Sequence, residues 1–239
     1  NDMLDLEKEL KKAGQVAHKL IITDGIFSMD GDIAKLDEIY SLARAHNAGI
    51  MVDDAHAIGI LGQTGKGTPE YFGLNGKIDL LMGTLSKALP GLGGYIAGKR
   101  EIIEYLKNTS RPFIFNLSLP PYIVATLLAA FEIIENEPEL RIKLWSNVAH
   151  MKKHLKRLGF GLAASESAII PILIKDDHKT CQITKLLEQM GVFVDPVIYP
   201  AVRKKESRIR LVVTAMHSIE DLDKSLSAFE DAGKKLGLI

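Results

Sequence analysis

The chain has 239 residues, enough for one large domain or two small ones. Of these residues 46% are hydrophobic and 25% charged, which is the composition of an ordinary globular protein. Thirty basic residues balance thirty acidic ones, which excludes the charge footprint of a protein that binds nucleic acid or an anionic membrane. No apolar stretch reaches the ~20 residues of a membrane span, no signal-peptide pattern is present, and the single cysteine, Cys181, excludes an internal disulfide, so a cytoplasmic protein is expected.

The first half of the chain alternates between strand and helix patterns. A helix is expected at residues 4–13, a buried strand at 19–23 and, after a loop rich in Gly and Asp, a helix around 36–43. Further apolar strands run over 49–53 and 79–87. This alternation predicts βαβ units in a mainly parallel sheet, and thus an α/β fold.

Residues 59–77 are rich in Gly and are expected to form a long loop, which is more often functional than idle. Another Gly-rich loop follows residue 87 and leads into a short strand at 95–98 and a helix at about 101–107.

The character of the chain changes from residue 120 onward. The elements expected there are helices at about 122–135 and 140–158, a strand at 168–174, a helix at 179–190, strands at 192–195 and 209–213, and a last amphipathic helix. Ser218 and Asp221 open that last helix with a pattern like a capping box. We therefore expect a major domain at 1–135 and a smaller α+β domain at 136–239.

Two of the apolar strands end where charged side chains appear. One runs into Asp53, Asp54 and His56, and the next runs into Lys87. The carboxyl ends of neighbouring parallel strands meet at one edge of an open sheet, so these side chains are expected to lie close together. A lysine amine can form a Schiff base with pyridoxal phosphate, and a carboxylate can keep the pyridine nitrogen protonated.

Asp53 and Asp54 point to opposite faces of an extended strand, so at most one of them is expected to meet a cofactor, and we choose Asp53. Spacing alone leaves an alternative open, in which the two acids cap a turn and the lysine lies on the surface. His150 and His154 have the spacing of a two-histidine metal site on a helix, but they lack an obvious third ligand. We interpret them as surface histidines and expect no metal site.

Four motifs together resemble a known family. They are DGIFSMDGD at 24–32, VDDAH at 52–56, GTLSK at 83–87 and SRIR at 207–210. In order and spacing they resemble the α-oxoamine synthases, a pyridoxal-phosphate family that includes glycine C-acetyltransferase, 8-amino-7-oxononanoate synthase, 5-aminolevulinate synthase and serine palmitoyltransferase. The resemblance covers essentially the whole chain and implies the aspartate-aminotransferase fold, the fold type I of pyridoxal-phosphate-dependent transferases.

The resemblance also implies roles for individual residues. Lys87 would hold the cofactor as a Schiff base and move the Cα proton of the substrate. Asp53 would pair with the pyridinium nitrogen, and His56 would lie beside the phenolic oxygen of the ring. Ser28 would hydrogen-bond near the same edge, and Thr84 would help to hold the phosphate.

A sixth residue for which the resemblance implies a role concerns the substrate. Arg210 would clamp the amino-acid carboxylate, a task that suits a bidentate guanidinium. An exposed strand-end arginine is the alternative, because its neighbour Arg208 is of the same type. The implied reaction condenses a small amino acid, glycine or serine, with an acyl-CoA and releases CoA and usually CO2. A homodimer with active sites at its interface is implied as well.

The branch of the family is less distinct. Residues 111–113 and the tail at 233–237 are similar to glycine C-acetyltransferase. Residues 71–74, 92–94 and 192–197 are similar to serine palmitoyltransferase instead. The length of the acyl chain stays open.

Two other functions remain in view. An aminotransferase of the same fold would also use Lys87 and Asp53. The chain starts at Asn1, and the resemblance implies that an N-terminal segment with which family members stack and bind the cofactor is missing from it. We therefore expect an incomplete major domain, which allows a truncated, non-catalytic fragment.

Overall fold

The computed structural model describes residues 1–14 and 16–239. It contains two compact units, one made of Asn1–Ile26 with Ile33–Pro138 and the other of Phe27–Asp32 with Glu139–Ile239. The units part between Pro138 and Glu139, whereas the sequence places a domain boundary after residue 135. The short segment Phe27–Asp32, which the sequence assigns to the major domain, is grouped with the C-terminal unit. The division into functional domains stays a prediction.

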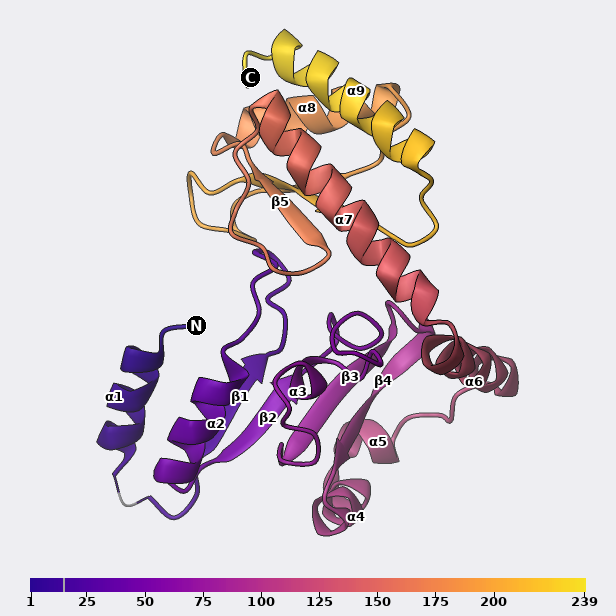
Figure 1. Cartoon of the computed structure of the whole chain (residues 1–239). Helices are drawn as coiled ribbons and strands as arrows, with labels where there is room; N and C mark the ends of the chain where they lie inside the picture. Colours follow the sequence, from indigo (N-terminus) through magenta and orange to yellow (C-terminus); the bar gives the residue numbers. More distant parts are fainter. Residues whose placement is uncertain (15) are drawn as a thin grey trace. The chain divides into compact units, whose positions relative to one another are not determined.

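The first unit contains a four-stranded sheet with the order β1-β2-β3-β4 (Figure 1). Strands β1 (Leu20–Asp24), β2 (Gly49–Asp53) and β3 (Leu80–Ser86) are parallel, and β4 (Pro90–Gly98) is antiparallel to β3. The predicted mainly parallel sheet is therefore confirmed. The predicted strand at 95–98 is too short, because the Gly-rich segment from Pro90 onward pairs with the end of β3 instead of forming a loop.

Six helices accompany this sheet in the described residues of the first unit. They are α1 (Met3–Ala13), α2 (Leu36–Ala45), α3 (Thr68–Tyr71), α4 (Arg100–Thr109), α5 (Arg111–Ile114) and α6 (Pro121–Asn136). Helix α2 packs against β2 and α1 packs against α2, while α4 and α6 contact β4 (Figure 1).

The two faces of the parallel strands are covered unequally. Ile21, Ile50 and Val52 are buried on one face. On the other face, Leu20 and Ile22 of β1 are 52% and 66% exposed. Alternation along a strand puts Asp24 on that exposed face, and its partner in the register, Asp53, lies on the same face.

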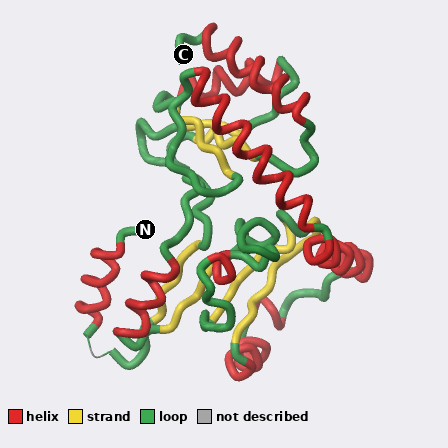
Figure 2. Tube along the Cα trace, in the orientation of Figure 1, coloured by secondary structure: helices red, strands yellow, loops and turns green. Residues whose placement is uncertain are grey.

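The second unit contains a three-stranded antiparallel sheet with the order β5-β7-β6. Its elements are α7 (Pro138–Leu158), β5 (Ile169–Leu173), α8 (Asp177–Gln189), β6 (Asp195–Val197), β7 (Arg208–Val212) and α9 (Ile219–Lys235). Figure 2 shows the strands of each unit in yellow, with separate sheets in the two units. The core of this second unit contains side chains with no exposed surface, including Leu155, Ile172, Ile183, Ile209 and Phe229.

Two local predictions have different outcomes. The capping box at Ser218 and Asp221 is present at the start of α9. The strand predicted at 192–195 is wrong, because the amide of Val192 still donates to the carbonyl of Leu187 at the end of α8, and β6 begins only at Asp195.

Within the described residues, none of the helices has the length and apolarity that a bilayer span requires.

Candidate active site

Lys87 stands on the turn between β3 and β4. Leu85 and Leu89, on either side of it, are buried and cluster with Leu127 of α6. These anchored neighbours hold the turn in place while the lysine itself is exposed. Its Nζ lies 3.0 Å from Nε2 of His56. With the ammonium group as donor, Nε2 accepts and the imidazole proton is on Nδ1.

Asp53 ends the neighbouring strand, β2. Its Oδ1 accepts a hydrogen bond from the amide of Ala55 at 3.0 Å, and its carbonyl accepts one from the amide of Gly25 at 2.7 Å. These bonds fix the carboxylate at the end of the strand. The structure thus has an acid at the end of β2 and an amine just after the end of β3, at the same edge of the sheet, as the strand pattern predicts.

Asp24 is a third charged group at this edge, and the sequence patterns predict no role for it. It is the register partner of Asp53 at the end of β1. Burial raises the pKa of Asp24, the negative charge of Asp53 raises it further, and Lys87 lowers it. The signal that could have found this residue is its position at the end of an apolar strand, like that of Asp53.

Asp54 has a different environment from Asp53. Its side chain is fully buried, and Oδ2 accepts a hydrogen bond from the amide of Thr68 at 2.9 Å. Gly25 and Gly67 leave the space for this carboxylate, since a Cβ atom on either would come within 2.2 and 1.8 Å of an Asp54 oxygen. Asp54 therefore ties the end of β2 to α3.

A Gly25→Ala substitution tests this arrangement. The added Cβ would lie 2.2 Å from Oδ1 of Asp54 and 2.3 Å from Oγ1 of Thr68, so buried polar atoms must shift. We expect the free energy of unfolding, measured by urea denaturation, to fall by roughly 1–3 kcal/mol. Gly161→Ala is the matched control, because nothing lies within 4 Å of its Cβ position. Equal stability of the two variants would contradict the close packing around Asp54.

The ionisation of Asp54 makes a second prediction. Burial raises its pKa to about 6, Thr68 opposes this through hydrogen bonding, and the charge of Asp53 adds to the rise. The folded protein keeps this proton at pH values where an unfolded chain has lost it, so the free energy of unfolding falls as pH rises from about 4 to above 6. The contribution is about 3 kcal/mol over that range.

An Asp54→Asn variant should lack this loss of stability. The amide oxygen can still accept from Thr68, but nothing ionises at that position. Thermal unfolding of both proteins at pH 5 and pH 7.5 measures the difference. The variant should gain stability relative to the parent as pH rises, and parallel pH profiles would show that the Asp54 pKa is not raised.

The remaining loop residues of the first unit are organised by short contacts. The carboxylate of Glu70 accepts from the amides of Thr64 and Lys66, so the predicted long loop at 59–77 has a defined shape and includes α3. The hydroxyl of Thr84, the residue expected to hold a phosphate, lies 2.9 Å from that of Ser86 and donates to the carbonyl of Gly93 at 3.2 Å.

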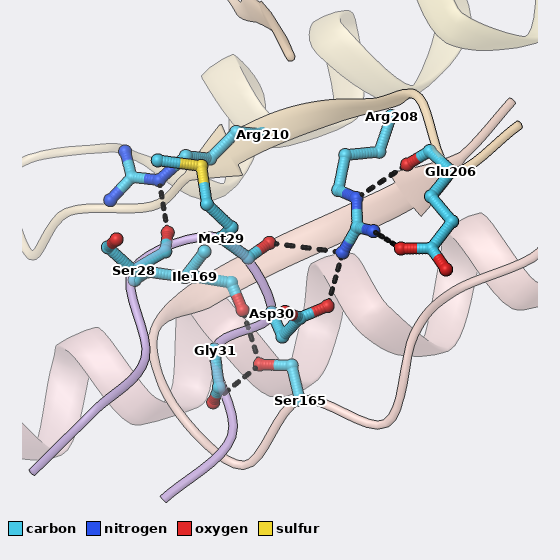
Figure 3. Close-up of polar contacts among 9 residues, drawn as sticks. All are labelled: Ser28, Met29, Asp30, Gly31, Ser165, Ile169, Glu206, Arg208 and Arg210. Carbon is cyan, nitrogen blue, oxygen red and sulfur yellow. Dashed lines mark hydrogen bonds and ion pairs between the residues drawn. The ribbon is translucent and has the colours of Figure 1, made fainter. Parts of the chain in front are cut away.

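Two further predicted residues, Ser28 and Arg210, lie together in the C-terminal unit (Figure 3). Nε of Arg210 donates to the carbonyl of Ser28 at 2.8 Å. Burial lowers the pKa of Arg210, and the charge of Asp195 opposes this. Arg210 is half-buried on β7, so the sequence alternative of a freely exposed strand-end arginine does not describe it.

The pair of histidines on α7 has a local partner. Nε2 of His150 lies 2.7 Å from Oδ1 of Asp223, and the ring of His154 lies 4.5 Å from that of His150. Over residues 1–14 and 16–239, no group of three or more His, Cys, Asp or Glu side chains is placed to hold a metal ion.

Comparison with known proteins adds a family. Residues 1–229 match the family of class I and II aminotransferases. The chain is 48% identical over 240 residues to an 8-amino-7-oxononanoate synthase of Thermoanaerobacter pseudethanolicus, and the match covers 100% of the chain but 61% of that protein. The chain therefore spans about three fifths of the length of the curated relatives it matches.

Solved structures also match the whole of this chain. A high-resolution structure of serine palmitoyltransferase with pyridoxal phosphate as internal aldimine matches with a TM-score of 0.96 and 33% identity, over 100% of this chain and 60% of that one. Sphingomonas wittichii serine palmitoyltransferase matches with a TM-score of 0.96 and 32% identity, over the same shares.

Proposed function

Because the chain belongs to the aminotransferase class I and II family and, through its 8-amino-7-oxononanoate synthase relatives, to the α-oxoamine synthases, we propose that the protein is a pyridoxal-phosphate-dependent acyltransferase. It would join a small amino acid to the acyl group of an acyl-CoA and release CoA and CO2. The observation that carries the proposal is the group formed by Asp53, His56 and Lys87 at the ends of β2 and β3, in a chain with these relatives.

The residues at this edge of the sheet fit the cofactor. Lys87 is exposed and its amine has an imidazole 3.0 Å away. Asp53 lies on the face of the sheet where Leu20 and Ile22 are exposed, so the described part of the chain leaves that face open at β1. An amine can hold the aldehyde of pyridoxal phosphate, a carboxylate can keep its ring nitrogen protonated, and an open face of the sheet leaves room for its flat ring.

The roles of the residues follow from their chemistry. When bound, pyridoxal phosphate supplies a pyridinium ring that accepts electrons from the Cα of an amino acid. Lys87 would hold it through Nζ and then move the Cα proton of the substrate. Asp53 would keep the proton on the ring nitrogen, and His56 would orient Nζ through Nε2 and lie beside the ring oxygen. Thr84 would bind the phosphate through its hydroxyl.

Two predicted residues of the C-terminal unit, Arg210 and Ser28, complete the proposal. Arg210 would bind the amino-acid carboxylate through its guanidinium, a planar group with paired donors. Ser28 would hydrogen-bond at the edge of the cofactor. The name of the curated relatives supports this reaction, because 8-amino-7-oxononanoate carries an amino group next to a ketone, the pattern that the condensation makes.

To test the proposal, the purified protein is incubated with pyridoxal phosphate, one amino acid (glycine, alanine or serine) and acyl-CoA thioesters of different lengths. Release of the CoA thiol together with an aminoketone, identified by mass spectrometry, is the expected result. Amino-group exchange between glutamate and a 2-oxo acid without CoA release would favour the aminotransferase instead. The preferred amino acid and acyl length then decide between the glycine C-acetyltransferase, serine palmitoyltransferase and 8-amino-7-oxononanoate synthase branches.

A homodimer is part of the proposal. The family resemblance implies a second copy at the active site, and large apolar side chains are exposed around α5 and α6: Phe113, Phe115, Leu117, Tyr122 and Leu128. A second copy would bury apolar surface of this kind. Sedimentation should give a dimer that Leu117→Asp weakens and Phe193→Asp, an equally drastic change on the other unit, does not. A monomer with full activity would overturn the proposed homodimer.

A cytoplasmic location, which a single free cysteine suits, stays a proposal as well.

A further inference from the structure

Arg208 holds a short piece of backbone from a distant part of the chain, the segment Phe27–Asp32 (Figure 3). Its Nη1 donates to the carbonyl of Met29 at 3.4 Å and pairs with the carboxylate of Asp30. Its Nε donates to the carbonyl of Glu206 at 2.9 Å. The Arg208 side chain is only 4% exposed, so these partners satisfy a buried guanidinium.

Arg210 holds the same segment one residue earlier. Its Nε donates to the carbonyl of Ser28. The two arginines are two positions apart on β7, so their side chains leave the same face of the sheet. Ile209, between them, points to the opposite face and is fully buried. One strand thus presents two guanidinium groups to consecutive peptide units.

The far end of the segment is held by backbone bonds. The carbonyl of Gly31 accepts from the amides of Glu166 and Ser167, both at 3.1 Å, and from Oγ of Ser165 at 3.3 Å. Gly31 has φ +70°, and a Cβ there would lie 2.6 Å from Oγ of Ser165 and 2.9 Å from the carbonyl of Ile169. The segment therefore fits this place only with glycine at position 31.

The two arginines differ in what they leave unused. Within the described residues, Nη1 and Nη2 of Arg210 make no hydrogen bond, whereas every nitrogen of the Arg208 guanidinium faces an oxygen. Nη1 and Nη2 together are the pair of donors that bind a carboxylate end-on. The bond from Nε to Ser28 fixes the plane in which this pair points.

We propose that Arg208 is a positioning residue: it fixes the segment Phe27–Asp32 on β7, and the carbonyl of Ser28 then sets the direction of the Arg210 guanidinium. The inference rests on the proposed role of Arg210 in binding an amino-acid carboxylate. In this proposal Arg208 binds the protein backbone and Arg210 binds the substrate. Arg208 itself touches no substrate.

The test uses two variants with one control. Arg208→Gln removes the clamp. Asp30→Ala removes one partner of Arg208 at a carboxylate that is more than half exposed and leaves Glu206 beside the guanidinium, so we expect this variant to fold and to serve as the test if Arg208→Gln does not fold. Arg203→Gln removes the same charge from an exposed arginine of the same unit. Hydrogen–deuterium exchange on the cofactor-free protein reads the segment directly, through the amides of Gly31, Glu166 and Ser167.

In Arg208→Gln and Asp30→Ala, exchange at these amides should accelerate about tenfold or more, while the control keeps the parent rate. With cofactor and both substrates, KM for the amino acid should rise by about tenfold and KM for the acyl-CoA should stay the same. Unchanged exchange in Asp30→Ala would overturn the proposal, as would faster exchange with an unchanged KM for the amino acid. If the parent protein binds no amino acid, the proposed function fails, and the exchange rates still decide whether Arg208 holds the segment.

Discussion

Replacement of Lys87 by arginine is expected to abolish CoA release from an amino acid and an acyl-CoA, with a loss of at least about a thousandfold in kcat. Arginine keeps the positive charge and can still donate to Nε2 of His56, which lies 3.0 Å from the lysine amine. It cannot lose its proton to act as a nucleophile or a base, since its pKa lies above ~12. The variant therefore separates a reactive amine from a mere positive charge.

The chain offers a control for this variant. Lys99 is also exposed in the first unit and precedes α4 without capping it through its side chain. Lys99→Arg should keep the parent activity. Borohydride reduction with pyridoxal phosphate, followed by peptide mapping, should label Lys87 in the parent protein and not in Lys87→Arg. A Lys87→Arg protein with a tenth of the parent activity would show that the amine is not the reactive group.

Asp53→Asn should have the next largest effect, a fall in kcat of about a hundredfold or more. Asparagine keeps the size of the side chain and can still accept from the amide of Ala55, so the end of β2 should keep its shape. It has no negative charge with which to keep the cofactor ring protonated. The loss should therefore appear in kcat, measured by CoA release, and not in the thermal stability of the protein.

The neighbouring acid supplies the contrast. Asp54→Asn makes the same chemical change one residue later, on a side chain buried against Thr68. It should change how stability depends on pH and leave kcat within a few-fold of the parent value. If the two variants lose kcat equally, the division of roles between the two acids is wrong.

The parts of the site that could be predicted lie at the ends of apolar strands. A short apolar run that stops at a charge gives both the strand and the position of the charged side chain, as with Asp53 and Lys87. The opposite directions of Asp53 and Asp54 follow from alternation along a strand. These features are local, so the sequence contains them.

Features set by distant contacts could not be predicted. The Gly-rich segment after Lys87 has a poor strand pattern, yet it forms the first part of β4 because the edge of β3 is available for pairing. Nothing in the motif at 24–32 indicates that its residues 27–32 join the C-terminal unit, because the buried Arg208 that holds them comes much later in the chain. The division of labour between Arg208 and Arg210 depends on that same contact.

The discontinuity of the C-terminal unit affects how homologous genes can be recombined. Asp30 and Arg208 are separated by 178 residues, so the segment Phe27–Asp32 emerges from the ribosome long before the strand that binds it, β7, is synthesised. A chimera joined between Pro138 and Glu139 would combine one parent's segment with the other parent's β7. A stable chimera therefore requires that residues 27–32 and the C-terminal part come from the same parent.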